Sequence, residues 1–523
     1  MSASTEKKKR QAAREAGTDK KMLAAQEALR KHRQSRLRWT LGIILVILLI
    51  AAILIFNWAI SSGYRYRQGT ALTIGDRSYS AAEVNYSYAN QYMSFANQYG
   101  SYASIFGLDT SAGLAGLDSQ SCPMLEDGTW KDYFLDAATD QLLQNKALTD
   151  YAAANGIALT EDEIAEVDAS FDGLEEYAKS LGYANANSLL SLNYGSGVTQ
   201  AIARQAQLES SLASKAYNEV LDGFTYTAEE LEEYYQGLEG SRDLFTYTYY
   251  HVLAETEAQT DEDGETVAVA SEQSLAEARA VADAIAAAYQ DGEEEDVAER
   301  FRVAVDSQLE GEAPAESRRV SGSSLDSAYQ DWLMDSRETG DLTVVPDGND
   351  EGYYVVLYLE RDDNHYPVAQ VRHILVMAEA DEDGTYTDEA KAAAKARAEE
   401  ILAEWEAGEK TEESFAALAE LYSEDSGSNT NGGLYDAVSK GQMVEEFDAF
   451  CFDEHQPGDT AIVYGESTSY AGYHVMYYVG QGELYSESIA RSALSSEAIS
   501  DWLADLTAGY EAVPGKQYKL IGK

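Results

Sequence analysis

The chain has 523 residues, of which 45% are hydrophobic, so it can bury several domain-sized cores. Its 38 Lys and Arg residues against 91 Asp and Glu residues give a net charge of −53, and a molecule this acidic repels phosphate backbones, which argues against nucleic-acid binding. Two cysteines, Cys122 and Cys451, are too few for a disulfide framework or a four-cysteine zinc site. We expect two buried thiols, with one long-range disulfide as the alternative.

The basic residues gather at the N-terminus. Residues 1–38 carry twelve basic and four acidic residues, a net of +8, whereas the rest of the chain carries a net of −61. The 26 uncharged residues of Trp39–Tyr64 follow, and at ~1.5 Å per residue they can cross a bilayer. The sequence therefore predicts a basic cytoplasmic tail at 1–38, a single transmembrane helix at 39–60 in the cell membrane, and an extracytoplasmic remainder. A cleavable signal peptide is the competing interpretation, but no Ala-x-Ala-like site follows.

Residues 64–240 are predicted to form a helical domain. Capping-box sequences begin at Ser80, Thr160 and Thr227, and each precedes a stretch with helical periodicity. Helical patterns extend over Trp130–Ala154, Glu161–Leu181 and Thr199–Leu221. After Ser80, aromatic residues recur at steps of three and four: Tyr88, Tyr92, Phe95, Tyr99 and Tyr102. This stripe is either a seam of the core or an adhesive surface for unfolded chains.

From about residue 245 the chain repeats itself. Three pairs of motifs recur at offsets of 122, 118 and 120 residues: Tyr249–Leu253 with Val371–Leu375, Gly340–Asp341 with Gly458–Asp459, and Gly352–Tyr354 with Gly472–His474. Two tandem copies of one α+β domain, at 241–362 and 367–481, are the simplest explanation. In the second copy the pattern predicts two strands and two helices, over 370–377, 388–407, 413–422 and 470–479.

Each copy also contains an Asp-Glu-Asp-Gly loop, at 261–264 and at 381–384. The glycine stands fourth in the loop rather than sixth, where a calcium loop has it, so we interpret both as hairpin turns. No metal or cofactor is predicted.

The second copy carries an ordered set of motifs: Arg372–Leu375, Phe415–Ala419, Tyr422–Ser423, Gly432–Gly433, Gly441–Met443, Phe447, Pro457–Asp459 and Gly472–His474. In this order and spacing the set resembles the signature of the parvulin peptidyl-prolyl isomerases. The wider layout is similar to the PrsA and SurA class of foldases, although a transmembrane helix replaces the usual lipid anchor of PrsA. The resemblance implies a SurA-N-like chaperone domain at 64–240, a degenerate parvulin-like domain at 241–362 and a parvulin domain at 367–481.

An isomerase of this kind needs no nucleophile, because rotation about an X-Pro bond makes and breaks no covalent bond. A site that binds the twisted amide better than the planar isomers suffices, which calls for an apolar cup and the exclusion of water. Met443 and Phe447 are four residues apart on one predicted helix face and would form this cup.

The resemblance assigns the remaining site residues. It implies that His373 and His474 are paired imidazoles at the floor of the cup, with Asp425 at a position where relatives have Cys or Asp. Ser469 would take the place of a family hydroxyl, and Tyr435, where many relatives have Leu, would reshape the rim.

The first copy has kept less of the motif set. At an offset of 122 residues His251 aligns with His373, but Tyr354 stands at the position of His474, so no catalysis is expected there. The leading interpretation is a membrane-anchored isomerase and chaperone for unfolded exported proteins that contain X-Pro bonds. The alternative is a non-catalytic holdase or scaffold that uses the same grooves. A protease finds little support, because no nucleophile with a matched base and no His-Glu-x-x-His motif occurs.

Residues 484–523 are predicted to be a C-terminal helix and tail. The candidate buried positions of the helix are Ile489, Leu494, Ile499, Trp502, Leu503 and Leu506, and the tail ends in the strand-like Gln517–Ile521. A lone helix of this length is marginal in water and needs an apolar partner. We expect it to return to the helical domain at 64–240, so that the two α+β domains are an insertion.

Overall fold

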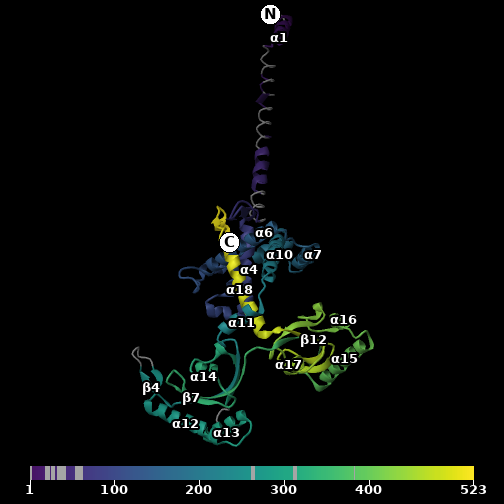
Figure 1. The fold of residues 1–523 in the computed structure, drawn as a ribbon. Coiled ribbons are helices and arrows are strands. Elements are labelled where there is room, and N and C mark those ends of the chain that lie inside the picture. The colour runs from purple at the N-terminus through teal and green to yellow at the C-terminus, as the bar shows by residue number, and fades with distance from the viewer. Residues whose placement is uncertain are drawn as a thin grey trace. The chain divides into compact units, whose positions relative to one another are not determined.

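The computed structural model describes residues 3–17, 24, 27, 30–31, 40, 43–53, 63–260, 266–309, 315–381 and 383–523. The chain divides into two compact units, Met1–Phe224 with Glu497–Lys523, and Thr225–Ser496 (Figure 1). The first unit is mainly helical, and the second contains two four-stranded sheets. The expected combination of a helical region with α+β domains is therefore present.

The N-terminal part contains α1 (Ala3–Glu15) and a helical stretch at residues 43–53, whose large aliphatic side chains are exposed. Among the described residues, no helix combines the length and the apolar character needed to cross a membrane. The span predicted at 39–60 lies partly outside them, because residues 39, 41–42 and 54–60 are not described.

Helices make up most of the first unit: α3 (Tyr64–Arg67), α4 (Ala81–Tyr99), α5 (Gly113–Gly116), α6 (Trp130–Asn155), α7 (Glu161–Ala169), α8 (Leu174–Ser180), α9 (Ala186–Tyr194) and α10 (Gln200–Asp222). The capping boxes predicted at Ser80 and Thr160 are confirmed, since each hydroxyl accepts a bond from the N–H three residues later and the Glu there bonds back. The helix expected over Glu161–Leu181 is instead two helices. Gly173 separates them by taking φ +73°, a left-handed conformation that interrupts a helix.

The C-terminal segment belongs to the first unit from Glu497 onward, within α18 (Tyr485–Thr507). β13 (Ala512–Pro514) then pairs antiparallel with β1 (Leu72–Ile74), whose other edge pairs with β2 (Arg77–Tyr79). The Tyr510 hydroxyl donates to Asp150 on α6 at 2.9 Å. Residues 497–523 therefore complete the sheet and pack on the helices of this unit.

The tail differs from the sequence-based expectation. The predicted strand at Gln517–Ile521 is wrong, because Tyr518–Leu520 form a 3-10 turn and β13 lies earlier in the chain. The N–H groups of Gly515 and Gln517 bond to the carbonyls of Ala71 and Thr70. These bonds turn the chain, and the side chain of Ile521 then enters the core with 1% of its surface exposed.

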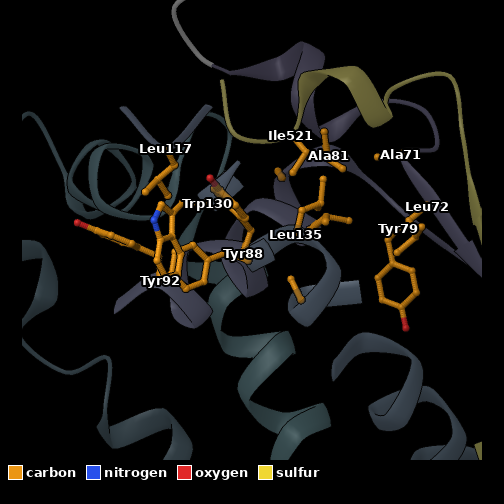
Figure 2. Close-up of a cluster of buried hydrophobic side chains, with 14 of the residues drawn as sticks. Ala71, Leu72, Tyr79, Ala81, Tyr88, Tyr92, Leu117, Trp130, Leu135 and Ile521 are labelled. Atoms are coloured by element: carbon orange, nitrogen blue, oxygen red, sulfur yellow. The ribbon is translucent and has the colours of Figure 1, made fainter. Parts of the chain in front are cut away.

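The core of the first unit is rich in aromatic side chains. Figure 2 shows Tyr88 and Tyr92 from α4 beside Trp130 from α6. Tyr88 and Tyr92 are buried, whereas Tyr102, beyond the end of α4, is exposed. Along α4 the aromatic stripe is therefore a seam of the core, and the interpretation as an adhesive surface is wrong for Tyr88 and Tyr92.

The second unit begins with α11 (Ala228–Gly237), whose predicted capping box at Thr227 is formed. The first α+β domain then contains β3 (Leu244–Leu253), β4 (Thr256–Thr260), β5 (Thr266–Ala270), α12 (Glu272–Asp291), α13 (Val297–Leu309), β6 (Glu316–Ser321), α14 (Gln330–Met334), β7 (Leu342–Pro346) and β8 (Gly352–Asp362). The loop predicted at 261–264 lies outside the described residues, but β4 and β5 pair antiparallel on either side of it.

The second α+β domain contains β9 (Pro367–Met377), α15 (Asp388–Ala407), α16 (Glu412–Tyr422), β10 (Leu434–Val438), α17 (Glu445–Phe452), β11 (Thr460–Glu466) and β12 (Ala471–Leu484). Its strand order β10-β9-β12-β11 repeats the order β6-β3-β8-β7 of the first domain, and all pairs in both sheets are antiparallel. Helices α15 and α16 pack against one face of the second sheet, and α17 packs against the other. Cys451 on α17 and Cys122 in the first unit are free and buried, which confirms the two predicted thiols.

Candidate active site

The two central strands of the second sheet bring two imidazoles together. His373 on β9 lies opposite Met476 of β12, and Leu375 lies opposite His474, so both histidines point to the face covered by α17. Their rings stack with centroids 5.2 Å apart, and their Nδ1 atoms are 3.0 Å apart. Both side chains are buried. The structure thus brings together the two imidazoles that the sequence predicts.

Asp425, in the loop after α16, accepts the hydrogen bonds that hold this pair. Its Oδ2 lies 2.9 Å from His373 Nε2 and also accepts from the hydroxyls of Ser428 and Tyr435, while its Oδ1 accepts from the N–H of Gly427. The bond from His373 lowers the pKa of Asp425 well below its ordinary value, so this carboxyl group is ionised at neutral pH.

The glycine pair before β10 brings this loop close to β9. Gly433 adopts φ +71°, and its carbonyl accepts the N–H of His373 at 2.9 Å. A Cβ atom on Gly433 would lie 2.2 Å from the carbonyl oxygen of His373, so a larger residue cannot stand there without moving the strand. The loop is also tied to β9 by the N–H of Glu424, which donates to the carbonyl of Leu375.

Asp425, His373 and His474 form a row of hydrogen-bonded groups, and Tyr470 extends it at the end opposite Asp425. The Tyr470 hydroxyl lies 3.0 Å from His474 Nε2. The carboxylate of Asp425 can only accept, so His373 carries its proton on Nε2. In the form with two uncharged imidazoles, each group donates to the next: Tyr470 to His474 Nε2, His474 Nδ1 to His373 Nδ1, and His373 Nε2 to Asp425. Burial and the neighbouring His373 lower the pKa of His474 to about 3, so His474 is neutral at physiological pH.

Apolar side chains cover the imidazole pair. The ring of Phe447 on α17 stands edge-on to His373 and His474, with centroid distances of 5.3 and 5.2 Å. The ring of Tyr435 lies 5.2 Å from that of His373, and burial raises the pKa of its hydroxyl to about 12. Met443 packs, partly buried, against the same cluster as Phe447. These side chains form an apolar layer over the imidazole pair.

Two sequence-based placements need correction. Met443 and Phe447 do not share a helix, because α17 starts at Glu445 after the extended N-cap Val444. Acidic residues in the first turn favour this start, since they complement the positive end of the helix dipole. Met443 reaches the cluster from the preceding turn.

Ser469 also lies elsewhere than predicted. It is exposed in the turn before β12, and its carbonyl accepts from the Tyr386 hydroxyl. The hydroxyl beside His474 belongs to the next residue, Tyr470, which sequence reasoning missed, together with Ser428. Strand alternation could have identified Tyr470, because residues four apart in an extended segment lie on the same face. A serine three residues after Asp425 was the corresponding signal for Ser428.

The first domain has a different set of side chains at the equivalent place. On β3, His251 lies opposite Tyr354 and Tyr249 opposite Val356, so Tyr249 rather than His251 corresponds to His373. The prediction that His251 aligns with His373 is therefore wrong by two residues, a shift that leaves the side chain on the same face. His251 instead bonds to Asp347 through Nε2 at 3.0 Å.

Tyrosines thus occupy both imidazole positions in the first domain. The rings of Tyr249 and Tyr354 are 5.7 Å apart, and Tyr329, at the position of Phe447, lies 6.1 and 5.3 Å from them. Tyr249 donates to Glu316. This arrangement is a cluster of aromatic side chains without an imidazole pair.

Two models of known protein families match parts of the chain. Residues 353–479 match the model of the PPIC-type PPIASE domain, and residues 22–173 match that of the SurA-like N-terminal domain. The second α+β domain is a parvulin domain. The residues of the imidazole site, from His373 to His474, lie within the range that matches the parvulin model.

Curated relatives include the chaperone SurA of Alkalilimnicola ehrlichii, 33% identical over 128 residues, and that of Hahella chejuensis, 31% identical over 176 residues. The matches cover 24% and 31% of this chain and 27% and 37% of those proteins, so the chain spans only about a third of the relatives' length.

The chain is also similar to solved structures. One is the peptidylprolyl isomerase PrsA from Bacillus anthracis, with 22% sequence identity and a TM-score of 0.17; the match covers 28% of this chain and 59% of the PrsA chain. Another is the foldase protein PrsA from Streptococcus pneumoniae, with 12% sequence identity and a TM-score of 0.23. This match covers 73% of this chain and 88% of the PrsA chain. TM-scores this low do not establish a common overall fold.

The low pKa of His474 predicts a pH-dependent stability. Between pH 6.5 and 3 the unfolded chain binds a proton on His474 and the folded chain does not, so this group lowers the free energy of unfolding as the pH falls, by up to ~1.4 kcal/mol per pH unit. Urea unfolding of the wild type and His474→Gln from pH 7 to pH 4.5 should show a steeper loss in the wild type. Parallel curves would contradict a buried, neutral His474.

Proposed function

We propose that this chain is an extracytoplasmic peptidyl-prolyl cis-trans isomerase that also acts as a chaperone for exported proteins. The isomerase proposal is carried by one observation: the His373–His474 pair, anchored on Asp425 and covered by Phe447, lies in the parvulin domain.

The site suits a rotation about the amide bond. The barrier of ~18–20 kcal/mol arises from amide resonance, and a site lowers it by binding the twisted amide more tightly than either planar isomer. Phe447 and Met443 would hold the proline ring. The row from Tyr470 to Asp425 satisfies the buried imidazoles internally, so the floor of the cup stays rigid and needs no hydrogen bond from the substrate. No covalent step is required.

The test is an isomerisation assay on a panel of X-Pro peptides by exchange NMR, with the full chain in detergent micelles. We expect acceleration in proportion to the amount of protein. Rates equal to those without protein, for every residue before proline, would contradict the proposal.

The clients we propose are unfolded or partly folded exported proteins. The match of residues 22–173 to the SurA-like N-terminal domain supports a chaperone role for the helical unit. The tyrosine cluster of Tyr249, Tyr329 and Tyr354 favours non-catalytic binding of client segments by the first α+β domain. The same tyrosine cluster favours the second candidate function, in which the whole chain is a holdase without catalysis.

We further propose that the chain is anchored in the cell membrane by one N-terminal helix, with its N-terminus in the cytoplasm. The twelve basic residues of 1–38 and the uncharged stretch Trp39–Tyr64 support this topology. The exposed aliphatic side chains at residues 43–53 support it as well, because water disfavours such a surface and lipid accepts it.

Protease digestion should reveal the topology. Added to intact cells, a protease should remove the acidic part of the chain and leave a small protected N-terminal fragment, detected through an N-terminal tag. Full protection of the chain would contradict the proposed orientation.

A further inference from the structure

Two cavities follow one another along α10, a helix of the first unit that packs against α4, α6 and α7 (Figure 1). The first, of about 400 Å³, lies between α4, α6 and α10, and the second, of about 740 Å³, lies between α7 and α10. Gln207 and Ser210 line both, so the two cavities join into one groove. From Ile202 to Asp222 this groove follows α10 for about 30 Å.

The first cavity is rich in side-chain amides. Asn90 and Gln91 on α4 are half-buried, and neither side chain bonds to another residue in the described part of the chain. An amide both donates and accepts hydrogen bonds, so these two groups are free to bond to a ligand in either sense. The other amides of this cavity are Gln141, Asn145, Gln205 and Gln207.

The second cavity continues the groove with hydroxyl groups. Ser210, Ser211, Ser214 and Asn218 follow at helical spacing along one face of α10. A serine within a helix often bonds to the carbonyl one turn before it, but within the described structure none of these three does. Their hydroxyls are therefore also available to a ligand.

The charges of the groove disfavour an anionic ligand. Arg77 pairs with Glu209, and Lys215 pairs with Glu163, so the basic side chains that line the described groove are already neutralised. Glu166, Glu219 and Asp222 add negative charge at the far end. A polyanion would be repelled from this groove.

Large apolar side chains contribute little accessible surface to the groove. Its two aromatic residues, Tyr79 and Tyr86, are only 2% and 8% exposed. An apolar peptide segment would therefore gain little by leaving water here. A neutral sugar chain fits better, because each sugar carries several hydroxyl groups that donate and accept, as the amides and serines of the groove do.

We propose that this groove binds a neutral, linear oligosaccharide, whose polar groups bond to the amides of the first cavity and to the serines of the second. Cell-surface glycans lie outside the membrane, so the inference rests on the proposed extracytoplasmic location and not on the isomerase activity. A chain of several sugars would occupy both cavities, whereas a disaccharide would occupy one.

The test uses the full chain in micelles of a zwitterionic detergent without sugar groups. The probe is fluorescein-labelled chitohexaose, whose acetamido groups can pair with side-chain amides. Fluorescence anisotropy should show saturable binding, about tenfold or more tighter than that of labelled chitobiose. Labelled hexagalacturonic acid, which carries a carboxylate on every sugar, should not bind. No binding of chitohexaose, or equal binding of the two hexamers, would overturn the proposal.

Two glutamines on α4 form a matched pair. Gln91→Ala should weaken chitohexaose binding about three- to tenfold, whereas Gln98→Ala, at an exposed position two turns later and outside the groove, should not. Asn218→Ala, in the second cavity, should weaken the hexamer as Gln91→Ala does. Equal affinity of the wild type, Gln91→Ala and Asn218→Ala would contradict the assignment of the site.

An unfolded polypeptide is the competing occupant. A proline-free Gly-Ser peptide with one Phe should not displace chitohexaose, and displacement at a similar concentration would overturn the proposal. X-Pro isomerisation should be the same with and without chitohexaose. Its absence from the wild type would contradict the isomerase proposal and leave this one standing.

Discussion

Replacing Asp425 by Asn should lower isomerase activity about tenfold or more and destabilise the second unit by about 1–3 kcal/mol. Three donors converge on Oδ2, from His373, Ser428 and Tyr435, and the N–H of Gly427 donates to Oδ1. An amide replaces one acceptor by a donor, so either the three donors to Oδ2 or the exposed N–H of Gly427 lose a partner. In the first orientation the imidazole pair loses its anchor, and in both orientations the negative charge beside His373 is removed.

Asp436→Asn is the matched control, since Asp436 is an exposed carboxylate on the same strand as Tyr435. It removes the same charge from the domain but no bond to the imidazole row. Activity on an X-Pro peptide and urea unfolding should separate the two variants. Equal effects would mean that net charge matters, rather than the hydrogen bonds to Asp425.

Replacing Ile521 by Ala should destabilise the first unit by about 2–5 kcal/mol, although Ile521 is only two residues before the last residue, Lys523. Its side chain is 1% exposed in the core that also contains Tyr88 and Trp130. The substitution leaves a cavity that the surrounding helices cannot fully close. Hydrogen exchange should become faster across α4 and α6 and stay unchanged in residues 241–481.

Val513→Ala is the control for this prediction. Val513 lies on β13 in the same segment but is 49% exposed, so its truncation removes little buried surface. Equal protection of α4 and α6 in both variants would show that the C-terminal segment does not stabilise the helical unit.

The sequence predicted the parts of this structure that depend on local patterns. The capping boxes at Ser80, Thr160 and Thr227 formed because each rests on side chains three residues apart. The imidazole pair also followed from the sequence, since an ordered motif set fixed His373 and His474 on two strands. Their neighbour Asp425 was found in the same way.

Strand register, and the positions of strands and turns that depend on distant residues, were harder to predict. A shift of two residues in β3 keeps His251 on the same face, so alternation alone could not reveal that Tyr249 is the counterpart of His373. A shift of one residue separates Ser469 from Tyr470, and only the backbone at the start of β12 decides which hydroxyl reaches His474. The tail strand was misplaced because β13 is defined by its partner β1, far away in sequence.

Two equivalent substitutions in the full chain test whether catalysis resides in the second α+β domain. His474 and Tyr354 occupy the same position in the two sheets. The measurement is the cis-trans exchange rate of one X-Pro peptide by NMR, with folding checked by circular dichroism. We expect a rate near the uncatalysed one for His474→Ala and a rate near that of the wild type for Tyr354→Ala. An equal loss in both, or full activity in His474→Ala, would contradict this expectation.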